Sequence, residues 1–179
     1  MKNRKYQIGV MGSAADLNYG KQIEEMAFDI GKLVAEKGHT LVYGAEKDYD
    51  SLSTAASRGA KSAGGLTVGV TYGKGMKIWD EEGNTDVVIA TGIERGGGRE
   101  FVLVNSCDAV IAISGGSGTL TELAIAYQSN IPMIVLVGTG GWADKMADQY
   151  FDARQRRICI GVKSAQDAVT KAIEMIERA

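Results

Sequence analysis

Short apolar runs alternate with amphipathic helical patterns along nearly the whole chain, and this alternation constrains the fold most. The apolar runs have strand length and cover residues 6–12, 40–43, 66–71, 87–90, 109–113, 133–137 and 158–162. Helical spacing covers residues 21–37, 51–63, 99–106, 119–129 and 164–178. Repeated strand–helix units predict a doubly wound α/β fold, with a mainly parallel sheet covered by helices on both faces.

Composition excludes several classes of protein. A length of 179 residues with 45% hydrophobic residues predicts a single domain over residues 1–179. The net charge of −2 argues against nucleic-acid binding, and the apolar stretches are too short to span a membrane. Neither a signal peptide nor a zinc or other metal site is indicated, since the chain has one histidine, His39, and two cysteines, Cys107 and Cys159. We expect a cytoplasmic protein with buried, reduced thiols and no bound cofactor.

A glycine-rich turn after the apolar run 109–113 carries the clearest chemical signal. It comprises Gly115, Gly116, Ser117, Gly118 and Thr119, directly before a helical pattern. Glycines let backbone N–H groups approach a ligand, and a helix N-terminus adds unpaired donors and a positive dipole end. The turn therefore predicts a binding site for a phosphate, most plausibly on a nucleotide.

Other glycine-containing loops follow neighbouring strands. Gly12 and Ser13 follow the first strand, and Gly44 follows the second. Ligands of doubly wound sheets bind beyond the carboxyl ends of the strands, where the strand order reverses. We therefore expect Gly12, Ser13 and Gly44 to contribute to the same site.

The segment 114–122 resembles the PGGxGTxxE signature of the Lonely Guy family, proteins long mislabelled as lysine decarboxylases. Arg99 lies sixteen residues before Gly115, where that family has an arginine, and Asp108-Ala109 matches its DA dipeptide. The resemblance covers roughly residues 6–137 and is strongest to the short branch near the molybdenum-cofactor carriers. It implies a Rossmann-like fold and a homodimer or higher homo-oligomer, whereas no residue context supports lysine decarboxylation.

Three segments depart from the family pattern. The glycine-rich turn expected after the second strand is replaced over Gly44–Leu52 by three acids, which would repel a phosphate unless Lys47 offsets them. Ser114 replaces the motif proline, a change we expect to be mild because the glycines carry the turn. Glycines 96–98 replace the usual neighbours of Arg99.

Two functions remain open. The leading hypothesis is a carrier or sensor that binds a phosphorylated nucleotide or pterin-type ligand at residues 114–119. The alternative is a nucleoside 5′-monophosphate phosphoribohydrolase, in which the resemblance gives Glu122 and Arg99 the catalytic roles. Retention of both residues favours the enzyme, and the altered loops favour the carrier.

The candidate catalytic residues also have structural interpretations. Thr119-x-x-Glu122 reads as a capping box that starts a helix, a role that can coexist with catalysis. Arg99 reads as a helix-start residue in a surface salt bridge with Glu94 or Glu100. Three loop aromatics, which more often pack locally, also qualify as the lining of a base pocket: Trp79, Trp142 and Tyr150.

Overall fold

The computed structural model describes residues 4–14, 18–80, 82–94 and 98–178. Its strands are β1 Gln7–Gly12, β2 Thr40–Gly44, β3 Thr67–Thr71, β4 Val87–Ala90, β5 Ala109–Ile113, β6 Met133–Leu136 and β7 Cys159–Val162. Its helices are α1 Lys21–Glu36, α2 Leu52–Ser62, α3 Arg99–Asn105, α4 Ser117–Gln128, α5 Gly141–Met146 and α6 Ala165–Glu177. The expected glycines 96 and 97, and part of the loop 12–18, lie outside the described residues.

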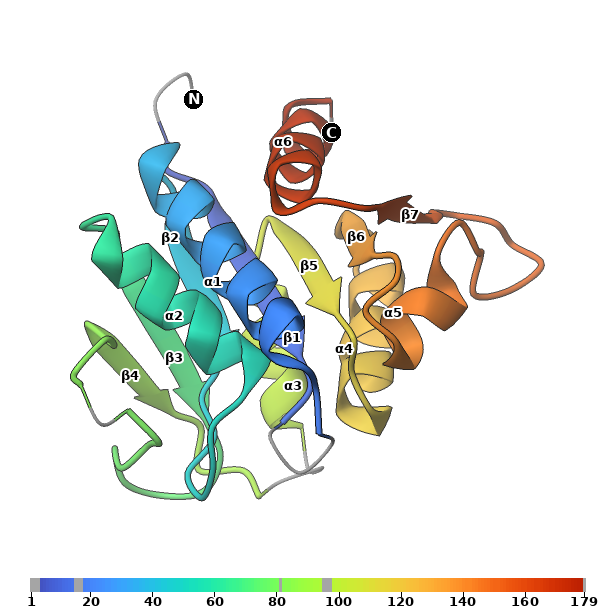
Figure 1. The fold of residues 1–179 in the computed structure, drawn as a ribbon. Coiled ribbons are helices and arrows are strands. Elements are labelled where there is room, and N and C mark those ends of the chain that lie inside the picture. The colour runs from blue at the N-terminus through green and yellow to red at the C-terminus, as the bar shows by residue number, and fades with distance from the viewer. Residues whose placement is uncertain (1–3, 15–17, 81, 95–97, 179) are drawn as a thin grey trace.

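All seven strands form one parallel sheet in the order β4-β3-β2-β1-β5-β6-β7 (Figure 1). From β1 the chain moves outward through β2, β3 and β4, and then returns through α3 to place β5 on the other side of β1. The strand order therefore reverses between β1 and β5. The prediction of a Rossmann-like, doubly wound α/β fold is confirmed.

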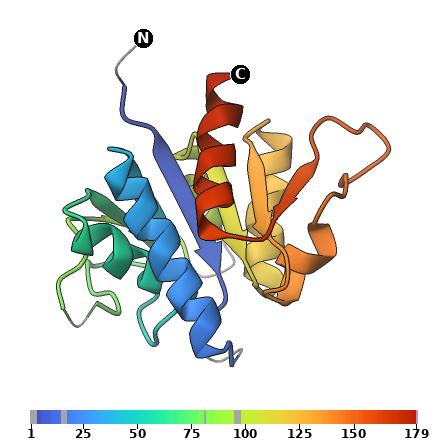
Figure 2. The same cartoon turned by 45° about the horizontal axis from the view of Figure 1, so that its top comes forward.

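Helices cover both faces of the sheet, as Figures 1 and 2 show. Helices α1, α2 and α6 bury one apolar cluster against the sheet, and α3, α4 and α5 bury the other. Strand β5 is buried over its whole length because it lies between both layers. Both cysteines are free and buried, as predicted, and burial raises the pKa of Cys159 to about 12.

Helices α1 and α2 approach each other through glycine. A Cβ atom on Gly31 would lie 1.8 Å from the carbonyl oxygen of Ala56, and one on Gly59 would lie 1.8 Å from that of Phe28. The two backbones are therefore in direct contact at both points. This close packing fixes the position of α2 against α1.

Element boundaries differ from the sequence prediction at one functionally relevant place. Helix α4 begins at Ser117 and not at Thr119, so part of the glycine turn already belongs to the helix. The long excursion before β4 has no helix or strand over residues 72–80 and 82–86, as expected. Within the described ranges, none of the helices combines the length and the apolar character needed to cross a membrane.

Candidate functional site

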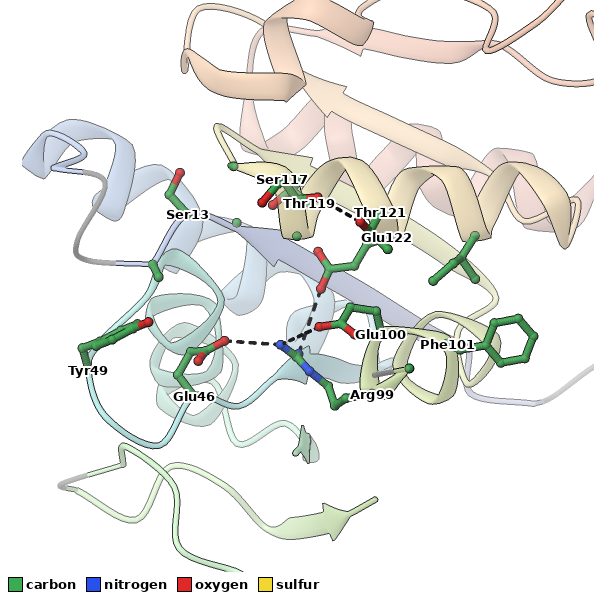
Figure 3. Close-up of a pocket in the computed structure, with 16 residues that line it drawn as sticks. Ser13, Glu46, Tyr49, Arg99, Glu100, Phe101, Ser117, Thr119, Thr121 and Glu122 are labelled. Atoms are coloured by element: carbon green, nitrogen blue, oxygen red, sulfur yellow. Dashed lines mark hydrogen bonds and ion pairs between the residues drawn. The ribbon is translucent and has the colours of Figure 1, made fainter. Parts of the chain in front are cut away.

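A cavity of about 570 Å³ opens at the carboxyl ends of β1 and β5, where the strand order reverses (Figure 3). Four segments line it: the end of β1, the loop after β2, the start of α3 and the first turns of α4. Eight of the predicted site residues lie in this lining, namely Gly12, Ser13, Arg99, Gly116, Ser117, Gly118, Thr119 and Glu122. Gly44 and Gly115 lie outside the lining and support residues within it.

The first turn of α4 presents backbone donors to the cavity. Gly116 is the N-cap residue, and no side chain caps the helix. The N–H groups of Ser117, Gly118 and Thr119 therefore lack intrahelical acceptors, and none of the described residues accepts from them. Together with the positive end of the helix dipole, these donors suit an anion.

The capping-box interpretation of Glu122 is wrong. Because α4 starts at Ser117, Thr119 is the third residue of the helix and Glu122 lies more than a turn inside it. The Glu122 side chain extends from the helix toward Arg99 and Glu100, as Figure 3 shows, and it makes no capping hydrogen bond at the helix start. Glu122 is therefore free of the structural role that competed with a role in the cavity.

Side chains from two other loops hold the glycine turn in place. The Ser13 hydroxyl accepts a hydrogen bond from the Gly115 N–H at 2.8 Å and donates to the Ser114 hydroxyl at 3.0 Å. The Ser114 N–H donates to Thr139 Oγ1 at 2.8 Å. Gly141 packs so closely on the turn that a Cβ would lie 2.4 Å from the Gly115 carbonyl oxygen. The Gly115 N–H is thus used internally.

Ser114 has a backbone conformation that proline cannot adopt. Its φ is +55°, whereas the proline ring holds φ near about −65°. Proline would also lack the N–H that bonds to Thr139. The replacement of the motif proline is therefore not the mild change expected, because proline could neither adopt the positive φ of this turn nor donate to Thr139.

Arg99 lies at the centre of a cluster of three carboxylates. Its Nη2 contacts Glu46 Oε1 at 3.3 Å and Glu100 Oε1 at 3.5 Å, and its Nη1 lies 4.0 Å from Glu122 Oε1. Only 5% of Arg99 is exposed, so the expected surface salt bridge is wrong: the contact with Glu100 exists but is buried. Arg99 Nε and Nη1 are buried and have no hydrogen-bond partner among the described residues.

Burial shapes the acid–base behaviour of Glu122. Desolvation is the largest effect, and it raises the pKa of Glu122 from 4.5 to about 7, although Arg99 acts in the opposite direction. Glu100 and Glu46 raise the pKa further. A carboxyl group with a pKa near neutrality can both release and accept a proton, which is what general acid–base chemistry requires.

The acids of the loop after β2 have partners of their own. Glu46 contacts Arg99, Asp48 accepts from the Tyr72 hydroxyl at 3.0 Å, and Asp50 pairs with Arg58 at 3.0 Å. Lys47, the residue of this loop that could offset these acids, donates to the Lys74 carbonyl oxygen at 3.0 Å. The loop therefore adds a negative charge to the cavity only through Glu46.

Eight residues that line the cavity were not among the predicted site residues: Ala14, Glu46, Tyr49, Gly98, Glu100, Phe101, Thr121 and Ile125. Two of them carried a signal in the sequence, Glu46 as one of the acids after the second strand and Glu100 as a possible partner of Arg99, but neither was predicted to line the site. The aromatics weighed for a base pocket, Trp79, Trp142 and Tyr150, are not in the lining. Trp142 packs locally, with Lys145 Nζ 4.5 Å from its ring centroid.

Comparison with protein families gives one match over nearly the whole chain, the SLOG cluster4 family over residues 5–169. An uncharacterized protein of Archaeoglobus fulgidus is 38% identical over 122 residues, 68% of this chain and 74% of that protein. The cytokinin riboside 5′-monophosphate phosphoribohydrolase of Mycobacterium tuberculosis is 32% identical over 111 residues. That match spans 59% of this chain but only 54% of the relative.

The solved structures that are similar over almost their full lengths include two molybdenum-cofactor proteins. The molybdenum cofactor binding protein of Rippkaea orientalis has a TM-score of 0.80 and 28% identity, covering 97% of this chain and 98% of that chain. The molybdenum cofactor carrier protein of Chlamydomonas reinhardtii has a TM-score of 0.78 and 30% identity, covering 98% of this chain and 100% of that chain. Because the matches cover almost all of both chains, the two proteins share with this chain the fold and nearly the same length.

Proposed function

Because this chain belongs to the SLOG cluster4 family, a Lonely Guy-like family near the molybdenum-cofactor carriers, we propose that it is a carrier or sensor that binds a phosphorylated, nucleotide-like or pterin-type ligand. The observation that carries the proposal is the uncapped start of α4, where residues 117–119 line the cavity and their N–H groups have no acceptor among the described residues. The ligand's phosphate would accept from these N–H groups.

The charges of the cavity support this orientation of the ligand. The donors and the dipole of α4 make one end positive, while Glu46, Glu100 and Glu122 surround Arg99 at the other end. A phosphate is attracted to the first end and repelled by the second. The organic part of the ligand would then lie over Arg99 and the carboxylates.

A single proline substitution in the first turn of α4 tests phosphate binding. Ser117 is the first residue of α4, where proline is tolerated and removes one N–H, so Ser117→Pro should weaken binding of ribose 5-phosphate about tenfold without unfolding the protein. Ala165→Pro is the matched control, because Ala165 is the first residue of α6 and lies outside the cavity lining. Equal affinities of wild type and Ser117→Pro by isothermal titration calorimetry would sink the proposal.

The hydrolase alternative is favoured by a different observation, the pKa of Glu122 near 7 beside a buried arginine. In that case Glu122 would activate water or stabilise the positive charge that develops on the ribose when the N-glycosidic bond breaks, and Arg99 would orient Glu122. The product of this chemistry is a free base and ribose 5-phosphate.

Base release from nucleoside 5′-monophosphates, natural and N6-modified, separates the two functions. Release by the wild type that is lost in Glu122→Gln establishes the hydrolase, with Glu174→Gln on α6 as the matched control. No release, combined with a raised melting temperature in the presence of the same nucleotides, leaves the carrier or sensor. If the protein releases no base and is stabilised by no phosphorylated nucleotide or pterin, both functions are contradicted.

A further inference from the structure

Glu100 and Glu122 are buried carboxylates to which no donor within the described ranges makes a hydrogen bond. Each is only 7% exposed, and both line the cavity. Their contacts with Arg99, at 3.5 and 4.0 Å, are longer than the N–H···O hydrogen bonds of about 2.7–3.2 Å usual in proteins. Among the described residues, no other group donates to either side chain.

Buried carboxylates of this kind need donors from elsewhere. An ionised carboxylate only accepts hydrogen bonds. Burying it without donors costs more free energy than burying a neutral group without hydrogen-bond partners. Glu46 differs, because Arg99 already donates to it at 3.3 Å. A ligand that brings N–H donors to Glu100 and Glu122 would therefore gain affinity that an acceptor-rich ligand would not.

The two carboxylates differ in what else is near them. Arg99 Nη1, which has no hydrogen-bond partner among the described residues, lies 4.0 Å from Glu122, so a small movement of Glu122 would satisfy this N–H. Arg99 Nη2, the atom nearest Glu100, already donates to Glu46. Glu100 is thus the carboxylate with most to gain from the ligand.

We propose that the ligand's ring is a 2-amino-4-oxopyrimidine, as in guanine and the pterins, and that Glu100 is the residue that selects it. This inference rests on the proposed function, since a phosphate at α4 directs the ring toward the carboxylates. The ring N–H and the exocyclic amino group of such a ring are adjacent donors. They match the two oxygens of one carboxylate, as a guanidinium group does.

Three nucleotides that differ at one ring position test the donor pair. Guanosine 5′-monophosphate has the amino group, inosine 5′-monophosphate has hydrogen, and xanthosine 5′-monophosphate has a carbonyl oxygen that would face Glu100. A hydrogen bond to a charged group corresponds to about ten- to a hundredfold in affinity. We expect the guanosine compound to bind tighter than the inosine compound by this factor, and the xanthosine compound to bind weakest.

The variant Glu100→Gln assigns the preference to this residue. Its amide keeps the shape of the side chain but replaces one acceptor oxygen with a donor, so the preference for the guanosine over the inosine nucleotide should fall to within about twofold. Binding of ribose 5-phosphate, which has no pyrimidine ring, should not weaken, because the variant removes a negative charge that repels the phosphate, and this binding shows that the variant is folded. Glu174→Gln, on α6, should keep the full preference.

A separate titration with neopterin monophosphate distinguishes a pterin ligand from a guanine nucleotide. Tighter binding of this compound than of the guanosine nucleotide identifies a pterin, and the reverse identifies a guanine nucleotide; both support the proposal. Equal affinity for all three nucleotides in the wild type would overturn it while leaving the phosphate site intact. Failure of every phosphate compound, ribose 5-phosphate included, would instead overturn the proposed function and this inference with it.

Discussion

The Arg99 guanidinium packs directly against Gly44: a Cβ atom at Gly44 would lie 2.1 Å from Arg99 Nη1. The buried guanidinium therefore takes its position against the bare backbone at the end of β2. Gly44 does not line the cavity, and its role is to leave room for the arginine that does.

Gly44→Ala should displace Arg99 without unfolding the protein, because the guanidinium is the movable end of a flexible side chain. We expect a stability change within about 1 kcal/mol and an affinity for phosphorylated ligands lowered about tenfold. Calorimetric titration and thermal melting measure the two effects. Gly20→Ala is the control, since nothing lies within 4 Å of a Cβ there. Unchanged affinity in Gly44→Ala would mean that the position of Arg99 does not matter for binding.

The raised pKa of Glu122 predicts a pH-dependent stability. Between pH 4.5 and about 7 the folded protein keeps a proton that the unfolded chain releases, so stability should fall as the pH rises through this window and level off above it. Glu122→Gln should remove the slope and be more stable than the wild type at about pH 8, by on the order of 3 kcal/mol.

Urea unfolding at several pH values measures this slope. Glu174→Gln should retain it, because Lys171 lowers the pKa of Glu174 and that shift affects only more acidic solutions. Parallel pH profiles for the wild type and Glu122→Gln would show that Glu122 ionises at an ordinary pH in the folded protein.

Restoring the family's proline should damage this protein. Ser114→Pro imposes a φ that the turn does not have and removes the N–H that donates to Thr139, so we expect a loss of about 3 kcal/mol or more in unfolding free energy. Ser114→Gly keeps the N–H and accepts a positive φ, and it serves as the control. Wild-type stability of Ser114→Pro in chemical denaturation would contradict the turn geometry.

The contact between α1 and α2 should tolerate no added side chain at Gly59. A Cβ there would lie 1.8 Å from the backbone oxygen of Phe28, and backbone cannot swing aside as a side chain can. Gly59→Ala should therefore destabilise the protein by about 1–3 kcal/mol despite the higher helix propensity of alanine. Ser62→Ala, near the end of the same helix, should change the melting temperature much less.

Local pattern determined the elements of this protein because burial follows chain periodicity. The uninterrupted apolar run 109–113 forms a buried strand. Ser164, a residue type that favours helix starts, accepts from the Asp167 N–H at the start of the last helix. The glycines of the turn at 115–118 indicated that its backbone closely approaches a ligand or another part of the backbone. From these elements the α/β fold and the neighbourhood of the cavity could be predicted.

Tertiary packing alone decided the chemistry of the cavity. Glu46 and Arg99 are far apart in the chain and meet only because the strand order places the end of β2 beside α3. The pKa of Glu122 depends on burial that no local pattern reveals, and the positive φ of Ser114 depends on Ser13 and Thr139 from other loops. Periodicity reports which side of an element is buried, but contacts between distant loops are set by how the whole sheet is ordered.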